Sequence, residues 1–259
     1  MSESNTNAVR FKIKRQDGPG QVTYWQEFEV PYRPNMNVIS CLQYIAEHPR
    51  TVQGHDTTPV VWDCNCLEEV CGACTMVING QVRQSCSALI DNLLKELDGG
   101  RTITLEPMTK FPVVRDLMVD RSRMFENLKK VKAWVPIDGT HSMGFGPTES
   151  QENQDTRYNL SKCMTCGCCL EACPQFQLGN EFQGAQVWSQ VRYFNMHGTG
   201  AVLKDQRLDA VMSTGGIADC GNAQNCVKVC PKEIPLTESI ADVGRQVTLR
   251  GFKRFFRGK

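Results

Sequence analysis

Cysteine is the residue type in this sequence with the most evident chemistry. Fourteen of the 259 residues are cysteine, in two groups separated by a cysteine-free stretch from residue 87 to residue 162. Thiols in this number can form disulfides, hold structural zinc or ligate iron–sulfur clusters. The N-terminus lacks the basic and apolar regions of a secretory signal, so we expect a cytoplasmic chain with reduced thiols rather than disulfides. The spacing of the cysteines then discriminates between zinc and iron.

The first group contains the spacing of a [2Fe–2S] site. Its cysteines follow the pattern C-x4-C-x2-C, and a fourth lies beyond Asn79-Gly80, a dipeptide typical of a tight β-hairpin turn. This is the plant-type ferredoxin arrangement, in which a loop brings three thiolates to one side of the cluster. Zinc is disfavoured because the gap of four residues breaks the paired-knuckle pattern. The predicted ligands are Cys66, Cys71, Cys74 and Cys86.

The second group contains two blocks with the spacing of a bacterial two-cluster ferredoxin. Residues 163–174 include C-x2-C-x2-C-x3-C-P, and residues 220–231 repeat this register with alanine at position 223. In such a pair, the first three cysteines of a block hold one cluster and the fourth crosses to the other. One predicted [4Fe–4S] site therefore has four thiolates, from Cys163, Cys166, Cys169 and Cys230. The other site has three, from Cys173, Cys220 and Cys226.

The missing fourth thiolate predicts the type of the last cluster. Alanine has no lone pair for iron, so the three-thiolate site favours [3Fe–4S], whose oxidised core is all ferric and accepts an electron readily. The alternative is a [4Fe–4S] cluster with an open or water-bound corner, because cluster type depends on more than the ligand count. Three cysteines lie outside every register and are expected not to bind iron: Cys41, Cys64 and Cys168.

The elements that must position the first group form a small mixed domain. Alternating apolar and charged residues predict strands, Asn37 can cap a helix, and leucines at helical spacing predict a second helix. The expected elements are strands at residues 9–14, 27–30, 75–78, 81–84 and 102–105, with helices beginning near 37 and 89. Their order is that of a β-grasp domain. The expected class is therefore α+β, with a plant-type ferredoxin domain over residues 1–118.

The rest of the chain is expected to be a connector followed by helices. Residues 119–156 combine helical pieces with a polar, turn-rich surface loop that begins at Pro136. Apolar residues recur at helical spacing from Tyr158 to Val247. We therefore expect an all-α domain of the bacterial ferredoxin type over residues 157–259, which holds the [4Fe–4S] and [3Fe–4S] clusters.

Bulk composition argues against several functional classes. The net charge is +1, so no basic field indicates a nucleic-acid partner, and no apolar run is long enough to span a membrane. No glycine-rich nucleotide loop is present, so we expect the flavin and substrate sites on another chain.

Residues 250–259 carry five cations, three phenylalanines and no acid. This segment is either a frayed, solvated end or a helix end near anionic lipid headgroups.

Taken together, the three blocks resemble the iron–sulfur subunit of succinate dehydrogenase and fumarate reductase. The likeness covers nearly the whole chain and includes residues 66–86, 163–174 and 220–231. It implies an electron-transfer subunit that passes single electrons between the FAD of a dehydrogenase subunit and quinone at a membrane anchor. It also implies a peripheral position on the cytoplasmic face of a bacterial membrane, with [2Fe–2S] nearest the flavin and [3Fe–4S] nearest the quinone.

Two positions differ from the members of this family that use ubiquinone. Those members have tryptophan after the Cys-Pro of the second block and histidine after the first cysteine of the third, where this chain has Gln175 and Gly221. The sequence is more similar to the menaquinone-linked group, whose single cytochrome b anchor carries two haems. Residues 31–37 and 215–220 also resemble bacterial members of that group.

Two other functions remain open on the sequence alone. The same relay could serve a soluble fumarate reductase that uses thiols, and a cytochrome b anchor in the purified complex would distinguish the membrane-bound enzyme from it. A free-standing ferredoxin is disfavoured, because such carriers are usually short and acidic whereas this chain is long and near neutral.

Overall fold

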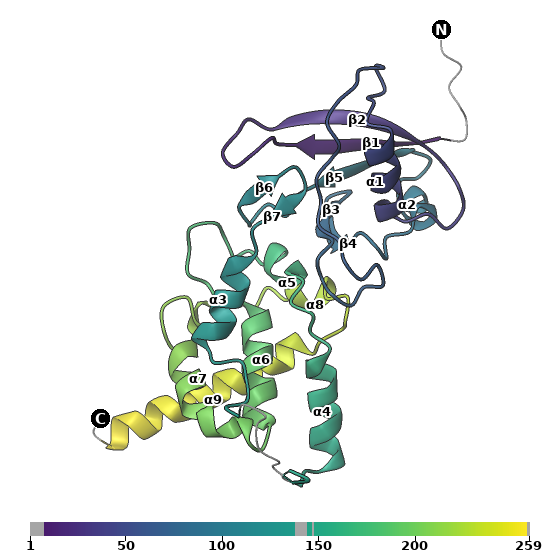
Figure 1. The fold of residues 1–259 in the computed structure, drawn as a ribbon. Coiled ribbons are helices and arrows are strands. Elements are labelled where there is room, and N and C mark those ends of the chain that lie inside the picture. Colours follow the sequence, from purple (N-terminus) through teal and green to yellow (C-terminus); the bar gives the residue numbers. More distant parts are fainter. Residues whose placement is uncertain (1–7, 138–143, 147, 258–259) are drawn as a thin grey trace. The chain divides into compact units, whose positions relative to one another are not determined.

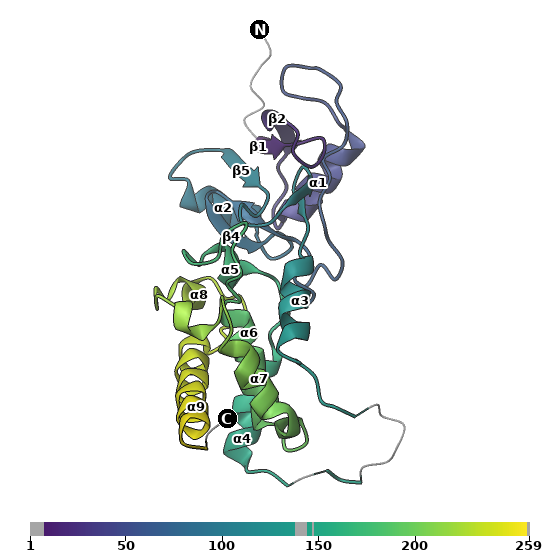
Figure 2. The ribbon, with the colours of Figure 1, turned by 90° about the vertical axis from the view of Figure 1, so that its left-hand side faces the viewer.

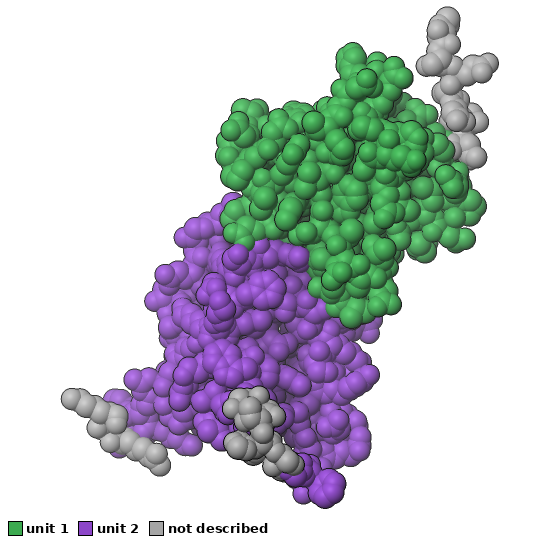
Figure 3. Space-filling model, viewed as in Figure 1, with its two compact units in different colours: residues 1–120 green, residues 121–259 purple. Residues whose placement is uncertain are grey.

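The computed structural model describes residues 8–137, 144–146 and 148–257, and the chain divides into two compact units, residues 1–120 and 121–259 (Figures 1 and 3). Part of the expected surface loop, residues 138–143 and 147, lies outside the described residues. No helix in the described ranges is both long and apolar enough to cross a membrane.

The first unit is built on a mixed five-stranded sheet, as a β-grasp domain requires. Its strand order is β2-β1-β5-β3-β4, with β1 parallel to β5 and the other neighbours antiparallel. The strands are β1 (Ala8–Arg15), β2 (Tyr24–Pro31), β3 (Thr75–Ile78), β4 (Gln81–Gln84) and β5 (Thr102–Glu106). Two helices, α1 (Val38–Glu47) and α2 (Ile90–Glu96), share its hydrophobic core. The expected α+β class is confirmed.

The sequence pattern accounts for these elements. Val9, Phe11 and Ile13 are all buried, and the charged residues between them lie on the more exposed face of β1. Helix α1 begins where expected, because the Asn37 side chain accepts a hydrogen bond from the Ser40 N–H at 2.9 Å and Ser40 Oγ accepts one from the Asn37 N–H at 3.1 Å. A separate hairpin, β6 (Val113–Arg115) and β7 (Met118–Val119), has no counterpart among the expected elements.

Helices make up the regular structure of the second unit across its described residues. They are α3 (Ser122–Lys130), α4 (Gln151–Ser161), α5 (Cys168–Glu171), α6 (Ala185–Met196), α7 (Lys204–Val211), α8 (Asn225–Lys228) and α9 (Leu236–Arg257), with short 3-10 turns η1 (Gly200–Leu203) and η2 (Ile217–Asp219). Helix α6 packs against α9, α4 and α7 (Figure 2). Its Val187 and Val191 are fully buried, in agreement with the helical spacing of the sequence.

Helix α4 corrects the expected surface loop. It begins at Gln151, inside the segment for which the sequence predicts a polar loop, and Ser150 Oγ caps it by accepting a hydrogen bond from the Asn153 N–H at 3.3 Å. Leu160 is the one buried residue of this helix. The sequence of this helix therefore lacks the apolar residues at helical spacing from which a helix is predicted.

Candidate metal centres

The predicted [2Fe–2S] ligands lie in and beside one loop of the first unit. Residues 66–74 lead directly into β3, and Cys86 follows shortly after β4. The side chains of Cys66 and Cys71 are hydrogen-bonded to each other, and so are those of Cys74 and Cys86. The structure thus brings the four predicted ligands together as two pairs of thiols, one on the loop and one at the open end of the β3–β4 hairpin.

The β3–β4 hairpin explains how Cys86 returns to the other thiols. Asn79 and Gly80 have φ angles of +49° and +75°, the left-handed values that a two-residue I′ turn requires, so the hairpin predicted from this dipeptide is confirmed. Antiparallel pairing places Thr75 opposite Gln84. Beyond these residues the Ser85 N–H donates to the Cys74 carbonyl at 3.2 Å, which keeps the two strand ends together.

Backbone N–H groups surround the first thiol of the loop. Cys66 Sγ accepts hydrogen bonds from the N–H groups of Glu68, Val70 and Cys71 at 3.5, 3.3 and 3.3 Å. These bonds, that from Glu68 foremost, lower the pKa of Cys66 to about 7, whereas burial raises the pKa of Cys74 to about 12. Because the thiolate is the form that binds metal, the loop favours the ligating state of Cys66.

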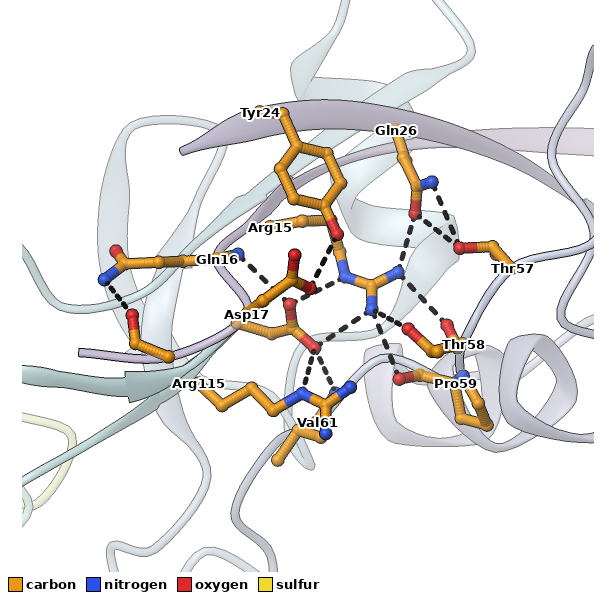
Figure 4. Close-up of polar contacts among 12 residues, drawn as sticks. Arg15, Gln16, Asp17, Tyr24, Gln26, Thr57, Thr58, Pro59, Val61 and Arg115 are labelled. Atoms are coloured by element: carbon orange, nitrogen blue, oxygen red, sulfur yellow. Dashed lines mark hydrogen bonds and ion pairs between the residues drawn. The ribbon is translucent and has the colours of Figure 1, made fainter. Parts of the chain in front are cut away.

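A buried ion pair fixes the segment that precedes this loop (Figure 4). Arg15 Nε donates to Asp116 Oδ1 at 2.8 Å, and both side chains are fully buried. Arg15 also donates to the Thr58 carbonyl at 3.2 Å, and Asp116 Oδ2 accepts from the Val61 N–H at 2.9 Å. Both partners therefore hold the stretch that runs into Cys66. The sequence offers no signal for this pair, which joins residues from two different hairpins.

The four thiols predicted to hold [4Fe–4S] line one hollow of the second unit. The first three come from the second cysteine block, and Cys230 comes from the third, as the crossing pattern requires. Burial is the main reason that the pKa values of Cys163 and Cys169 are raised, and the neighbouring thiols add to it. The pKa of Cys166 is instead lowered, chiefly by a hydrogen bond from the Cys168 side chain.

The three thiols predicted for the last cluster line a second hollow. Here the crossing residue is Cys173, which joins Cys220 and Cys226. Burial raises the pKa of Cys226, and the proximity of Cys173 and then of Cys220 raises it further. Ala223, at the fourth position of the register, lines the same hollow. We call the two spaces the four-thiol hollow and the three-thiol hollow.

The donor sets of both hollows fit iron–sulfur clusters. Sulfur is the soft ligand that such clusters take, and thiolates held this close require a cationic centre to offset their mutual repulsion. Over the described ranges, no three His, Cys, Asp or Glu side chains converge closely enough to hold one metal ion. A cluster is a body of several atoms, so its ligands surround a larger space than the ligands of a single ion do.

Helix α6 contributes side chains to both hollows. Ala185 and Trp188, one turn apart, line the three-thiol hollow. Gln186 lines the four-thiol hollow, and the Gln190 side chain donates a hydrogen bond to Cys163. None of these residues belongs to a cysteine motif of the sequence. Their spacing on a helix that follows the Cys-Pro of the second block is the signal that could have singled them out.

The three cysteines outside the predicted registers have different surroundings. Cys41 lies in the core of the first unit, where burial raises its pKa to about 12. Cys64 is exposed on the loop segment before Cys66. Cys168 is fully buried and lines the four-thiol hollow beside the predicted ligands. Position alone does not separate Cys168 from the ligands, so its place outside the ligand set stays a prediction.

Comparison with known proteins gives matches over nearly the whole chain. A family described as a 2Fe-2S iron-sulfur cluster binding domain matches residues 10–126, and one described as a 4Fe-4S dicluster domain matches residues 159–234. The chain is 58% identical to the succinate dehydrogenase iron–sulfur subunit of Bacillus subtilis, over 99% of this chain and 98% of that protein. It is 27% identical to the fumarate reductase iron–sulfur subunit of Haemophilus influenzae, over 91% of this chain and 90% of that protein.

A solved structure has the same fold. A chain of the Mycobacterium smegmatis Sdh1 complex in the apo form superposes with a TM-score of 0.77 at 21% sequence identity. The match covers 95% of this chain and 98% of that chain. At this identity the likeness establishes the fold, a mixed-sheet unit followed by a helical one.

Proposed function

Because the chain belongs to the family of succinate dehydrogenase and fumarate reductase iron–sulfur subunits, we propose that it passes single electrons between the FAD of a dehydrogenase subunit and a quinone at a membrane anchor. It is an electron-transfer subunit of an oxidoreductase complex, with a [2Fe–2S] domain and a [4Fe–4S] domain. The clusters, when bound, supply the one-electron redox chemistry. The residues of this chain position the thiolates, shield them from water and set their hydrogen bonds.

The proposal rests on which cysteine side chains the fold brings together. The loop and hairpin of the first unit would hold [2Fe–2S] on Cys66, Cys71, Cys74 and Cys86. The four-thiol hollow would hold [4Fe–4S] on Cys163, Cys166, Cys169 and Cys230. The three-thiol hollow would hold [3Fe–4S] on Cys173, Cys220 and Cys226.

The [3Fe–4S] assignment is supported by the position of Ala223. This residue lines the three-thiol hollow at the point of the register where a two-cluster ferredoxin has cysteine. Its methyl group offers iron no ligand. A site with three thiolates therefore matches a cluster with three iron corners.

The proposed quinone is menaquinone, bound at a cytochrome b anchor that carries two haems. Gln175 and Gly221 line the three-thiol hollow in place of the tryptophan and histidine of ubiquinone-linked members. A Cβ atom at Gly221 would lie 2.8 Å from Gln175 Nε2, so a histidine there would require Gln175 to move. The two positions are therefore neighbours in this hollow. With such an anchor, the chain would lie on the cytoplasmic face of the cell membrane.

The test is an EPR redox titration of the intact complex, together with quinone extraction and haem analysis. We expect a [2Fe–2S] signal on reduction, a [3Fe–4S] signal in the oxidised state, menaquinone, and two haems b. A complex that contains no cytochrome b would support the soluble, thiol-linked fumarate reductase instead. Absence of the oxidised-state signal would contradict the [3Fe–4S] assignment.

A further inference from the structure

Trp188 lines the three-thiol hollow, and its indole N–H is buried without a partner. Trp188 is 1% exposed, and its Nε1 is a buried polar atom with no hydrogen-bond acceptor. The residue lines the hollow together with Cys173, Cys220 and Cys226. Among the residues that line this hollow, all of which the structure describes, Trp188 is the one with such an unpartnered side-chain atom.

The unpartnered donor requires a physical explanation. A buried N–H that lacks an acceptor loses its hydrogen bond to water and gains none in return, so folded proteins seldom contain one. Where one occurs, a bound group that accepts the hydrogen bond is a recognised cause. The indole has no partner in the described structure, and Trp188 lines the three-thiol hollow, so a group bound in that hollow is the candidate acceptor.

Packing holds the indole in place. Phe182 meets it edge-on, with ring centroids 5.4 Å apart, and is itself 4% exposed. The backbone carbonyl of Phe182 accepts a hydrogen bond from Arg123 at 2.9 Å, which secures the segment before α6. Ala185, one turn earlier on α6, lines the same hollow and leaves room for the larger ring.

We propose that Trp188 donates its indole N–H to a sulfur of the cluster held by Cys173, Cys220 and Cys226, and that this hydrogen bond raises the reduction potential of that cluster. A donor stabilises the reduced cluster more than the oxidised one, because the added electron makes the sulfurs more negative. The proton remains on the indole nitrogen throughout. This inference rests on the proposed function, which places a cluster in the hollow.

The effect is specific to one cluster. The side chains of α6 that serve the four-thiol hollow are Gln186 and Gln190, and neither lines the three-thiol hollow. Trp188, in turn, does not line the four-thiol hollow. Removing its N–H should therefore shift one potential and leave the potentials of the other two clusters unchanged.

The first measurement is a redox titration of the intact complex with the Trp188→Phe substitution, followed by EPR. Phenylalanine keeps a ring against Phe182 and removes the donor. We expect the ratio of reduced to oxidised cluster at fixed potential to fall by about tenfold, equivalent to about 59 mV for a one-electron couple. The matched control is Trp134→Phe, which alters a half-exposed tryptophan of the same unit that lines neither hollow.

A second measurement separates the hydrogen bond from packing and does not depend on a variant that folds. Pulsed EPR of the unsubstituted complex with 15N-indole-labelled tryptophan should show one nitrogen coupled to this cluster, and Trp134→Phe should retain that coupling. An uncoupled nitrogen, or an unchanged potential in Trp188→Phe, overturns the inference while the cluster signals leave the proposed function standing. Absence of any cluster signal from this hollow, in either redox state, overturns both.

Discussion

Ala223 lies in the three-thiol hollow where the ferredoxin register places a fourth cysteine. Its three thiol neighbours come from two blocks that are distant in sequence, and the fold brings them to one hollow without a fourth sulfur. The proposed cluster type, and with it the electron affinity of the last site, therefore depends on the side chain at this single position.

We expect Ala223→Cys to convert this site to [4Fe–4S]. The new thiolate supplies the fourth ligand, and conversion should lower the reduction potential, since cluster type is one determinant of potential. Each drop of about 59 mV makes electron transfer to quinone about tenfold less favourable. EPR should show loss of the oxidised-state [3Fe–4S] signal, and quinone reduction should slow. Succinate oxidation with an artificial acceptor that takes electrons from the flavin should keep its rate.

Ala210→Cys is the matched control for that experiment. It adds a thiol on α7, in the same unit, at a residue that lines neither hollow. The control should retain the [3Fe–4S] signal. Retention of this signal and its potential in Ala223→Cys as well would mean that the missing ligand does not determine the cluster type.

The three cysteines outside the registers should tolerate substitution without loss of any cluster. The most demanding case is Cys168, which lines the four-thiol hollow and donates a hydrogen bond to Cys166. Cys168→Ser keeps a donor and Cys168→Ala removes it, and we expect both to retain the [4Fe–4S] signal. Loss of that cluster in both variants, measured by EPR and iron content, would identify Cys168 as a ligand. Cys41→Ala and Cys64→Ser should likewise retain the [2Fe–2S] signal.

Among the elements, strand β1 and the β6–β7 hairpin are joined by the buried pair of Arg15 and Asp116. We expect Arg15→Met to lower the free energy of unfolding by about 3–5 kcal/mol, because it leaves the Asp116 carboxylate buried with only the more distant Arg115, whose Nε is 4.0 Å from Oδ2, as a cation. Occupancy of the [2Fe–2S] site should also fall, since Thr58 and Val61 lose their common support. Chemical denaturation and the reduced-state EPR intensity measure the two effects.

The same substitution on the same strand provides the control. Arg10 is half-exposed and its Nη1 lies 3.9 Å from Glu27, so Arg10→Met should cost no more than about 1 kcal/mol. Equal stability of the Arg15→Met and Arg10→Met variants would show that the buried pair contributes little to the unit.

The C-terminal turns of α9 have two different faces. Arg250 bonds Asp205 and Asp209 of α7 at 2.6 and 2.9 Å, which fixes one face against the unit. Phe252, Phe255 and Leu249, by contrast, are more than half exposed. An exposed apolar face beside a run of cations is typical of helices that lie at a membrane surface.

We expect removal of this aromatic face to weaken attachment of the chain to membranes. The triple variant Phe252→Ser, Phe255→Ser, Phe256→Ser should lower the fraction recovered with the membrane after a high-salt wash, as should deletion of residues 251–259. The control is Phe125→Ser, which removes a phenylalanine of α3 that is 51% exposed. Unchanged recovery of the deletion variant would indicate that the segment is a solvated helix end.

At the scale of the whole molecule, each unit contains its own cysteine sites. The core cluster that runs from Val9 to Leu117 lies wholly within residues 1–120. We therefore expect the fragment 1–120, reconstituted without oxygen, to fold and bind about two iron atoms as [2Fe–2S]. Its reduced-state EPR spectrum should match that signal in the intact complex. A fragment that binds iron but gives no cooperative unfolding transition would show that the first unit requires the second.

The sequence by itself determined the features that depend on local order along the chain. The C-x4-C-x2-C and C-x2-C-x2-C-x3-C spacings predict the ligand sets, because a short loop around a cluster fixes the number of residues between ligands. The Asn79-Gly80 turn, the cap at Asn37 and the alternation in β1 followed for the same reason. Each depends on neighbours within a few residues.

Tertiary structure alone decided the features that depend on contacts between distant residues. Arg15 and Asp116 are 101 positions apart, so no local pattern relates them. Helix α4 lacked an apolar repeat because almost all of its residues remain outside the core. The unpartnered N–H of Trp188, a residue that lines the three-thiol hollow, is visible only once α6 and both cysteine blocks are assembled, because burial and the absence of a partner are properties of the packed chain.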